Sequence, residues 1–278
     1  MTRSWLFVPG DSPRKMEKSL GSGADALILD LEDSVPAEGK ALARREVGRF
    51  LAQPAPMPRH VRINALDTGL AEADIAATIA ARPAGYVLPK CEGPDDIDRL
   101  ARMIAAVGTP VPITVIATET ARGLRRLQRE DWAHPALGAI TWGGEDLSAD
   151  LGASRNRDGA GRYLPLFQSA RDTALLAARE AGVVALDGVY TALDDPDGLE
   201  AEARAAVALG FDGKLAIHPA QIPVIHRAFM PDAAQLDWAR QVVAVLAQDG
   251  AARLNGQMLD RPHLRQAQRL LARAGQAG

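Results

Sequence analysis

Eight short runs rich in β-forming residues recur along the chain, and longer stretches rich in Ala, Leu and Arg separate them. This alternation is typical of βα units around a parallel sheet, and eight such units predict an α/β fold, a closed (β/α)₈ TIM barrel. The expected strands are Ser4–Val8, Ala26–Asp30, His60–Ile63, Gly85–Leu88, Ile113–Ala117, Ala139–Trp142, Val184–Val189 and Lys214–Ile217.

The segments between these runs consist largely of good helix formers. A doubly wound open sheet is the alternative architecture, but it typically carries a G-x-G-x-x-G loop after its first strand, whereas residues 9–13 here read Pro-Gly-Asp-Ser-Pro. The barrel is therefore the preferred fold. Its expected helices include Ala71–Ala81, Pro94–Val107, Tyr163–Ala181 and Leu199–Leu209.

The length of the chain fits one barrel followed by an extension. It has 278 residues, and a barrel of this kind typically needs about 250. We expect residues 1–219 to form the catalytic barrel and residues 220–278 to form a C-terminal helical extension. Within the extension, the pattern indicates a helix at Ala233–Gln248, a loop at Gly250–Leu259 and a helix at Pro262–Ala274. An extension beyond the barrel is expected to cover another part of the protein or to reach a neighbour.

Composition excludes several classes of partner. A net charge of −3 and an aromatic content of 4% give no basic, aromatic surface for nucleic acid. The apolar runs are far shorter than the roughly 20 residues of a membrane-spanning helix, and the N-terminus lacks the apolar core of a signal peptide, so a cytoplasmic location is expected. The single cysteine, Cys91, excludes an internal disulfide and a cysteine metal cluster.

Charged residues follow almost every expected strand. The active site of such a barrel lies at the C-terminal ends of its strands, so these residues are expected to face one mouth. Any one of them is equally well explained as a solvated loop residue, but the set is not. They are Asp30, Glu32, Asp33, Arg62, Lys90, Glu119, Glu145, Asp146, Asp187 and His218.

Glu119 and Asp146 follow consecutive strands, which predicts that their carboxylates lie close enough to share a cation. Oxygen ligands without nearby Cys or paired His favour a hard ion, Mg²⁺, with Mn²⁺ as a substitute. The adjoining Gly143-Gly144 pair lets the backbone approach a ligand closely. The alternative is a surface salt bridge from these carboxylates to Arg122 or Arg125.

Arg62 ends a strand, so its guanidinium is expected to emerge into the mouth, where a planar fork suits a carboxylate or an enolate oxygen. Its alternative is an ion pair with Asp30 or Glu32, and the two roles are compatible. Lys90 is either a Schiff-base amine or, as we prefer, an ion-pair partner.

The remaining polar residues admit structural readings. His218, followed by Pro219, is expected to fix the last loop rather than to transfer protons. Asp187 is as well explained by a turn or a supporting acceptor as by catalysis. Arg14 and Lys18 begin the first helix, where positive charge would meet a phosphorylated substrate; a solvated helix face is the alternative.

Eight motifs occur in order along nearly the whole chain: RSWLFVPG at residues 3–10, LDLEDSV at 29–35, VRIN at 61–64, LPK at 88–90, ET at 119–120, GGEDL at 143–147, DG at 187–188 and IHP at 217–219. Together they resemble the citrate lyase β-subunit and malyl-CoA lyase family. The resemblance implies a (β/α)₈ barrel in which Glu119 and Asp146 hold Mg²⁺. It also implies that Glu119 and Arg62 contact the substrate, with Arg62 binding the acyl oxygens.

The same resemblance implies a substrate and a reaction. The substrate is a 3-hydroxyacyl thioester of coenzyme A or of an acyl carrier protein, cleaved reversibly between two carbons into an acetyl thioester and a 2-oxo acid. Asp260, in the lid-like segment GQMLDRP at 256–262, is expected to exchange the acetyl methyl proton and to enter a neighbouring subunit of a homo-oligomer, a trimer or hexamer. Glu32, Asp33 or a metal-bound water is expected to handle the hydroxyl proton.

Three alternatives remain at this point. A thioesterase on the same scaffold would release the free 3-hydroxy acid. A true citrate lyase β subunit would act on a citryl-acyl carrier protein. A metal-free scaffold subunit would have no catalytic role, which the presence of Glu119, Asp146 and Arg62 argues against.

Overall fold

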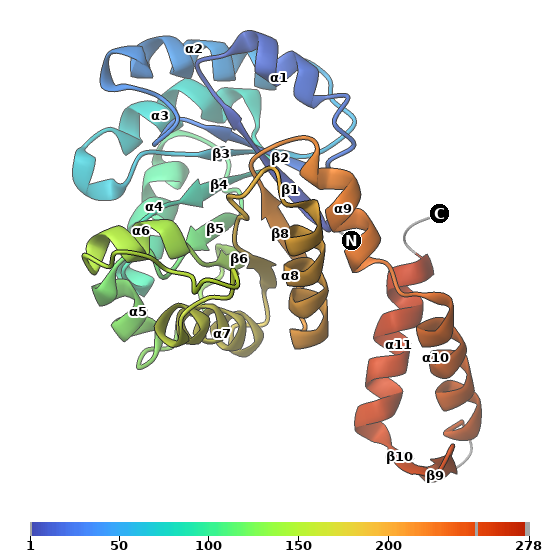
Figure 1. The fold of residues 1–278 in the computed structure, drawn as a ribbon. Coiled ribbons are helices and arrows are strands. Elements are labelled where there is room, and N and C mark those ends of the chain that lie inside the picture. Colours follow the sequence, from blue (N-terminus) through green and yellow to red (C-terminus); the bar gives the residue numbers. More distant parts are fainter. Residues whose placement is uncertain (1, 248–249, 276–278) are drawn as a thin grey trace. The chain divides into compact units, whose positions relative to one another are not determined.

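Eight parallel strands close into a barrel in the first part of the chain (Figure 1). Closure follows from strand β1, which pairs with β2 on one side and with β8 on the other. The predicted TIM barrel is therefore confirmed, and the open sheet is excluded. The strands are β1 (Ser4–Pro9), β2 (Ala26–Asp30), β3 (Arg59–Arg62), β4 (Gly85–Leu88), β5 (Ile113–Ile116), β6 (Leu137–Thr141), β7 (Val184–Asp187) and β8 (Gly213–Ala216).

This computed structural model describes residues 2–247 and 250–275. The chain forms two compact units, one of residues Thr2–Ile225, which contains the barrel, and one that begins at His226. No helix within the described residues is long and apolar enough to cross a membrane.

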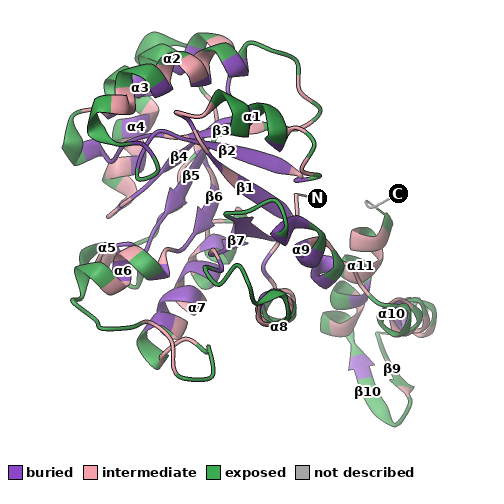
Figure 2. Cartoon of the chain, turned by 45° about the horizontal axis from the view of Figure 1, so that its top comes forward, coloured by how far each residue is buried: buried purple, intermediate pink, exposed green. Residues whose placement is uncertain are grey.

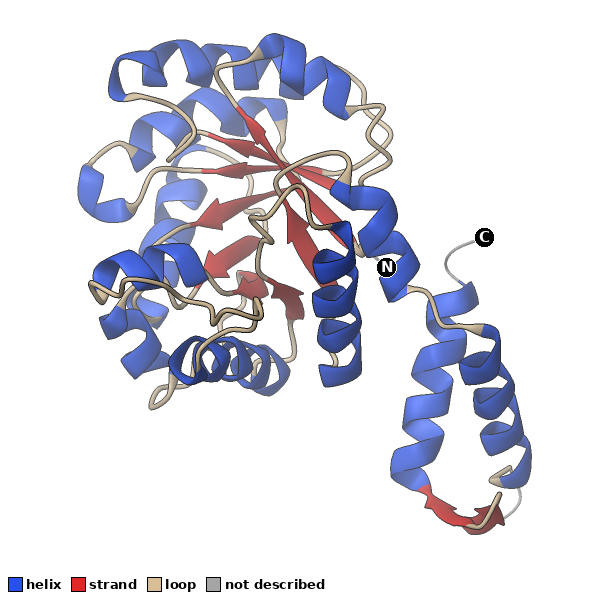
Figure 3. Cartoon of the chain, in the orientation of Figure 1, coloured by secondary structure: helices blue, strands red, loops and turns tan. Residues whose placement is uncertain are grey.

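Helices surround the barrel strands, as Figure 3 shows in blue around red. Their inner faces are buried and their outer faces exposed (Figure 2). In α4, for example, Ile97, Leu100 and Ile104 are buried at helical spacing. The helices are α1 (Pro13–Ser19), α2 (Lys40–Leu51), α3 (Ala71–Thr78), α4 (Pro94–Val107), α5 (Ala121–Leu127), α6 (Gly144–Asp150), α7 (Pro165–Glu180) and α8 (Pro196–Leu209). Helix α9 (Gln221–Phe229) follows β8 and continues into the unit that begins at His226.

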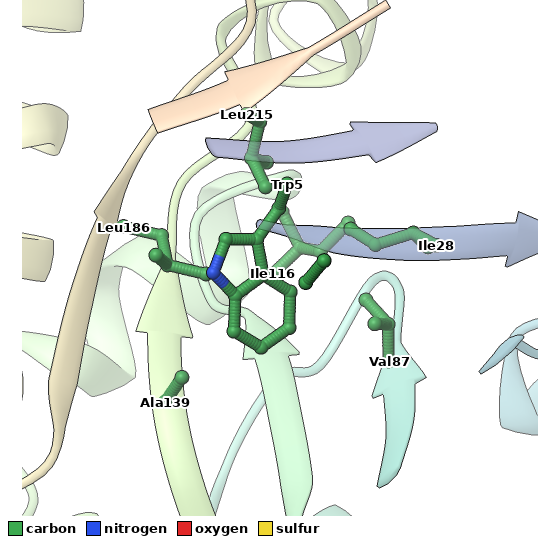
Figure 4. Packing of buried hydrophobic residues seen from close by; sticks show 8 residues of the cluster. Trp5, Ile28, Val87, Ile116, Ala139, Leu186 and Leu215 are labelled. Carbon is green, nitrogen blue, oxygen red and sulfur yellow. The ribbon is translucent and has the colours of Figure 1, made fainter. Parts of the chain in front are cut away.

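The interior of the barrel is filled by apolar side chains from its strands. The Trp5 indole lies among residues contributed by six of the other strands, as in the packed layers expected of this fold (Figure 4). Burial of this surface stabilises the barrel and leaves the polar ends of the strands free for chemistry. The cluster consists of Trp5, Ala26, Ile28, Val87, Ile116, Ala139, Leu186 and Leu215.

The second unit is a helical pair joined by a β-hairpin. Helix α10 (Ala233–Val245) begins at a capping box made by Asp232 and Gln235, and α11 spans Arg261–Gly275. The predicted loop at Gly250–Leu259 is wrong, because β9 (Ala251–Leu254) and β10 (Gln257–Asp260) pair there in antiparallel register. The expected end of the first helix at Gln248 lies outside the described residues.

Candidate active site at the barrel mouth

The first anchor of the site is a two-point ion pair between neighbouring strands. Asp30 and Arg62 end β2 and β3 and lie opposite each other in the register. The Arg62 Nε and Nη2 atoms each donate a hydrogen bond of 2.7 Å to the Asp30 carboxylate. Burial alone would raise the pKa of Asp30, but the Arg62 guanidinium holds it below its ordinary value. Asp30 is thus one of the two partners that the sequence left open for Arg62.

Glu32 joins Arg62 to Lys90. One Glu32 oxygen lies 2.9 Å from Arg62 Nη1, and the other accepts a hydrogen bond of 2.5 Å from Lys90 Nζ. Burial would lower the pKa of Lys90, but Glu32 and other nearby carboxylates raise it above its ordinary value. Lys90 therefore stays protonated, which favours the predicted ion pair over a Schiff-base amine.

Lys90 also organises the two predicted metal ligands. Its backbone N–H donates a 2.5 Å hydrogen bond to Glu119 Oε2, and its Nζ lies 3.3 Å from Asp146 Oδ1. Its φ of +50° lies in the left-handed region, an uncommon conformation for a residue with a long side chain. Sequence reasoning missed this double role. The position of Lys90 after Pro89 at a strand end indicated the mouth but not the contacts.

Glu119 is buried, and its negative charge is poorly compensated. Burial, followed by repulsion from Asp146 and Glu32, raises the pKa of Glu119 to about 8. Gly143 packs tightly on this side chain, since a Cβ at Gly143 would lie 2.5 Å from Glu119 Cγ. The alternative salt bridge to Arg122 is not what forms, because Arg122 lies 3.4 Å from Glu92 instead.

These residues fit a hard divalent cation. Burial and repulsion from the neighbouring Asp146 carboxylate penalise the charge of Glu119, and a cation between the two carboxylates would relieve both penalties. Mg²⁺ is commonly held by one or two carboxylates, with waters or substrate completing its shell. In residues 2–247 and 250–275, no group of three or more His, Cys, Asp or Glu side chains could hold a metal ion. A cation at this site would therefore need water or substrate oxygens to complete its coordination shell.

A small pocket opens beside the carboxylate pair. It is lined by the charged residues Arg62, Glu119 and Asp146 together with several apolar side chains. The Phe7 ring lies under the Arg62 guanidinium, 4.8 Å from Cζ to the ring centroid. Sequence reasoning missed this apolar wall, whose residues read only as strand core. The wall is made of Phe7, Ile116, Trp142, Val189 and Leu215.

Other predicted residues lie at the edge of this cluster or outside it. Asp33 is more than half exposed, 3.7 Å from Arg62 and 3.8 Å from Lys90. Arg14 and Lys18 are exposed on α1, without an ion pair among the described residues. Asp260 belongs to the second unit, where its carboxylate lies 2.7 Å from His263 Nδ1.

Two more predicted residues have structural contacts. His218 Nδ1 accepts a hydrogen bond from the backbone N–H of Ala220, which agrees with a role in fixing the last loop. Asp187 is fully buried and hydrogen-bonded to Arg171, Lys214 and Trp142, so it is a supporting acceptor below the mouth.

Comparison with known proteins shows similarity along nearly the whole chain. Residues 3–219 match the model of the HpcH/HpaI aldolase/citrate lyase family. The chain is 40% identical to a citrate lyase subunit beta-like protein of Mycobacterium tuberculosis, over 98% of this chain and 96% of the relative. It is 34% identical to a (3S)-malyl-CoA thioesterase of Cereibacter sphaeroides (98% and 94% covered) and 33% identical to the mitochondrial citramalyl-CoA lyase of Mus musculus (98% and 86% covered).

The fold is also similar to a solved structure. The crystal structure of CitE from Mycobacterium tuberculosis, in complex with magnesium, acetoacetate and coenzyme A, matches with a TM-score of 0.86 and 38% sequence identity, covering 98% of each chain.

Proposed function

The chain belongs to the HpcH/HpaI aldolase/citrate lyase family, and on this premise we propose that it is a Mg²⁺-dependent carbon–carbon lyase acting on a 3-hydroxyacyl thioester of coenzyme A. The observation that carries the proposal is the buried Glu119 carboxylate beside Asp146, next to the Arg62 guanidinium at the barrel mouth. Two relatives support it. One is named a citramalyl-CoA lyase, and the other was solved in complex with magnesium, acetoacetate and coenzyme A.

Each charged group has a task in the proposed cleavage. Mg²⁺, held by Glu119 and Asp146, would supply Lewis-acid stabilisation of the substrate hydroxyl as it loses its proton. Glu32 or Asp33 accepts that proton, the C–O bond becomes a carbonyl, and the electrons of the broken C–C bond move into the thioester as an enolate. Arg62 neutralises the enolate oxygen. Asp260 then donates a proton to the enolate carbon, which gives the acetyl thioester.

The charge balance of the mouth supports a choice among the possible 2-oxo acid products. Two cations, Arg62 and Lys90, lie among six carboxylates, so a bound divalent ion would still leave an excess of two negative charges; the six are Asp30, Glu32, Asp33, Glu119, Glu145 and Asp146. In this proposal the pantetheine arm of the thioester takes the open side of the mouth, and the 2-oxo acid lies against the apolar wall. A hydrogen or methyl substituent suits that wall, whereas a second carboxylate would be repelled. We therefore propose a malyl-CoA or citramalyl-CoA type of substrate over a citryl one.

Product analysis tests the proposal. Purified protein is incubated with Mg²⁺ and malyl-CoA, citramalyl-CoA or citryl-CoA, and acetyl-CoA and the 2-oxo acid are measured. We expect cleavage of the first two and its loss after chelation. Asp146→Ala is expected to remove metal binding without unfolding the barrel, because a mouth carboxylate contributes little to the core. Full activity after exhaustive chelation would refute the metal assignment.

A thioesterase is the second candidate, because one relative with 34% identity is named a (3S)-malyl-CoA thioesterase. The same assay separates the two, since hydrolysis releases free coenzyme A and the intact 3-hydroxy acid. Offering the acyl group on an acyl carrier protein tests the citrate lyase β-subunit alternative. Absence of metal binding and of turnover on every thioester would favour the non-catalytic scaffold.

A further inference from the structure

Beneath the mouth lies a buried charge network that the proposed chemistry does not use. Asp187, at the end of β7, is completely buried. Arg171 from α7 donates hydrogen bonds of 2.8 and 3.0 Å to its two oxygens, and Lys214 from β8 donates one of 2.8 Å. Burial would raise the pKa of Asp187, but Lys214 and Arg171 hold it well below its ordinary value. The carboxylate is therefore charged and fixed from two sides.

The Asp187 carboxylate also binds Trp142, which lies between strand β6 and Gly143 at the start of α6. Trp142 Nε1 donates a 2.9 Å hydrogen bond to Asp187 Oδ1, and the indole is 1% exposed. The Tyr163 ring packs edge-on against it, 4.8 Å between centroids. Gly188 closes a further side, since a Cβ there would lie 3.0 Å from Trp142 Nε1. The indole consequently has one position.

Trp142 is in turn connected to both proposed metal ligands. Its neighbour Gly143 packs so closely on Glu119 that a Cβ would lie 2.5 Å from that side chain. Gly143 also begins the turn into α6, which carries Asp146 in its first turn. A shift of the indole would therefore move the backbone that separates Glu119 from Asp146.

We propose that Asp187 and Trp142 are positioning residues that set the spacing of the Glu119 and Asp146 carboxylates through the indole N–H···carboxylate hydrogen bond. This inference rests on the proposed metal site. Residues behind a metal site commonly contribute 10–100-fold to metal affinity by orienting its ligands. The Asp187 network is built for that task, because its own charges are satisfied without Trp142.

The test compares two Trp→Phe variants of the full chain. Trp142→Phe removes the hydrogen bond, while Asp187 keeps Arg171 and Lys214. Trp132→Phe is the matched control, because Trp132 is 2% exposed and its Nε1 has no hydrogen-bond partner among the described residues. Mn²⁺ binding is measured by electron paramagnetic resonance, Mg²⁺ by competition, and folding by thermal unfolding. We expect the dissociation constant for Mn²⁺ to rise at least about tenfold in Trp142→Phe and to stay within about twofold in Trp132→Phe.

A second pair of variants covers the case in which Trp142→Phe does not fold. Gly188→Ala pushes on the indole without removing any polar group, and Gly159→Ala, with open space around its Cβ position, is its control. Weaker Mn²⁺ binding in Gly188→Ala alone supports the inference. Equal affinities across wild type, the indole variants and the controls overturn it. If the wild-type chain binds no Mn²⁺, the proposed metal site is wrong and this inference falls with it.

Discussion

Arg62 serves two purposes that a sequence cannot separate. Its fork binds both oxygens of Asp30, and its remaining nitrogen lies 2.9 Å from Glu32. The attraction of these carboxylates outweighs burial and raises the pKa of Arg62 above its ordinary value. The guanidinium is therefore a fixed positive charge at the pocket, preorganised for an enolate oxygen before the substrate arrives.

Replacing Arg62 by lysine tests that role. A single ammonium cannot hold Asp30 at two points and also face the substrate, so we expect kcat to fall about 100-fold while the barrel stays folded. Steady-state cleavage of citramalyl-CoA measures the effect. Arg59→Lys is the control, because Arg59 lies on the same strand but binds backbone carbonyls such as Leu51 O and Gln53 O. Near-normal turnover in Arg62→Lys would reduce Arg62 to a structural ion-pair partner.

His60, at the other end of the same strand from the mouth, makes the stability of the barrel depend on pH. Its ring stacks on Trp5 with 4.2 Å between centroids, and burial lowers the pKa of His60 to about 4. The unfolded chain takes up a proton near pH 6.5 and the folded chain does not, so stability is full above about pH 6.5 and decreases as the pH falls toward 4.

Between pH 7 and pH 5, this one residue is expected to lower the free energy of unfolding by about 2 kcal/mol. Urea unfolding of wild type and His60→Phe at both pH values measures the contribution, because the other titrating groups are common to both proteins. If both proteins lose the same stability on acidification, His60 is not the buried neutral group inferred from its environment.

At the scale of elements, two valines lie toward opposite ends of the barrel, one at the start of β7 and one just beyond its end. Val189 follows the strand at the apolar wall of the pocket, and Val184 begins the strand, 38% exposed. A cation placed at this wall should attract the second carboxylate of a citryl substrate, which would have no positively charged partner there in the wild type. We expect Val189→Arg to raise kcat/KM for citryl-CoA at least about tenfold relative to citramalyl-CoA. Val184→Arg should leave the ratio unchanged. A wild-type preference for citryl-CoA would contradict the charge argument outright.

The elements also show what the sequence could predict. Strand positions came out within a few residues because each β-rich run is short and flanked by helix formers or turn residues. The gathering of the carboxylates at one mouth could then be predicted, since parallel strands bring their C-terminal ends to one side. Helix α9 and the two hairpin strands β9 and β10 were not predicted. Helix α9 was hidden by Pro223, although proline is tolerated in a first helical turn.

The sequence contains a local turn signal for the hairpin β9–β10. Asn255 and Gly256, both with positive φ, form a two-residue turn, the dipeptide most typical of hairpins. The double contact of Lys90 carried no such signal, because it depends on distances between strands far apart in sequence. Local turn chemistry is readable from a sequence, whereas cross-strand contacts need the register.

At the scale of the whole molecule, the position of Asp260 decides how the proposed reaction is completed. Its carboxylate is 53% exposed, at the junction of β10 and α11 in the unit that begins at His226. The His263 ring, 2.7 Å away, is its neighbour on α11. We propose that Asp260 acts in the site of an adjacent subunit of a homo-oligomer, in which activity depends on assembly.

Complementation between two inactive chains tests this sharing. Asp260→Ala chains retain the metal ligands, and Asp146→Ala chains retain the proton donor, so each is expected to be inactive alone. In mixed oligomers, some sites combine wild-type Asp146 from one chain with wild-type Asp260 from its neighbour, and partial activity should return in proportion to the fraction of such sites. Activity is measured after co-expression, with size-exclusion chromatography to establish that both variants are folded and co-assembled. Mixtures that co-assemble yet stay as inactive as either parent would place Asp260 in the site of its own chain, or restrict it to its local contact with His263.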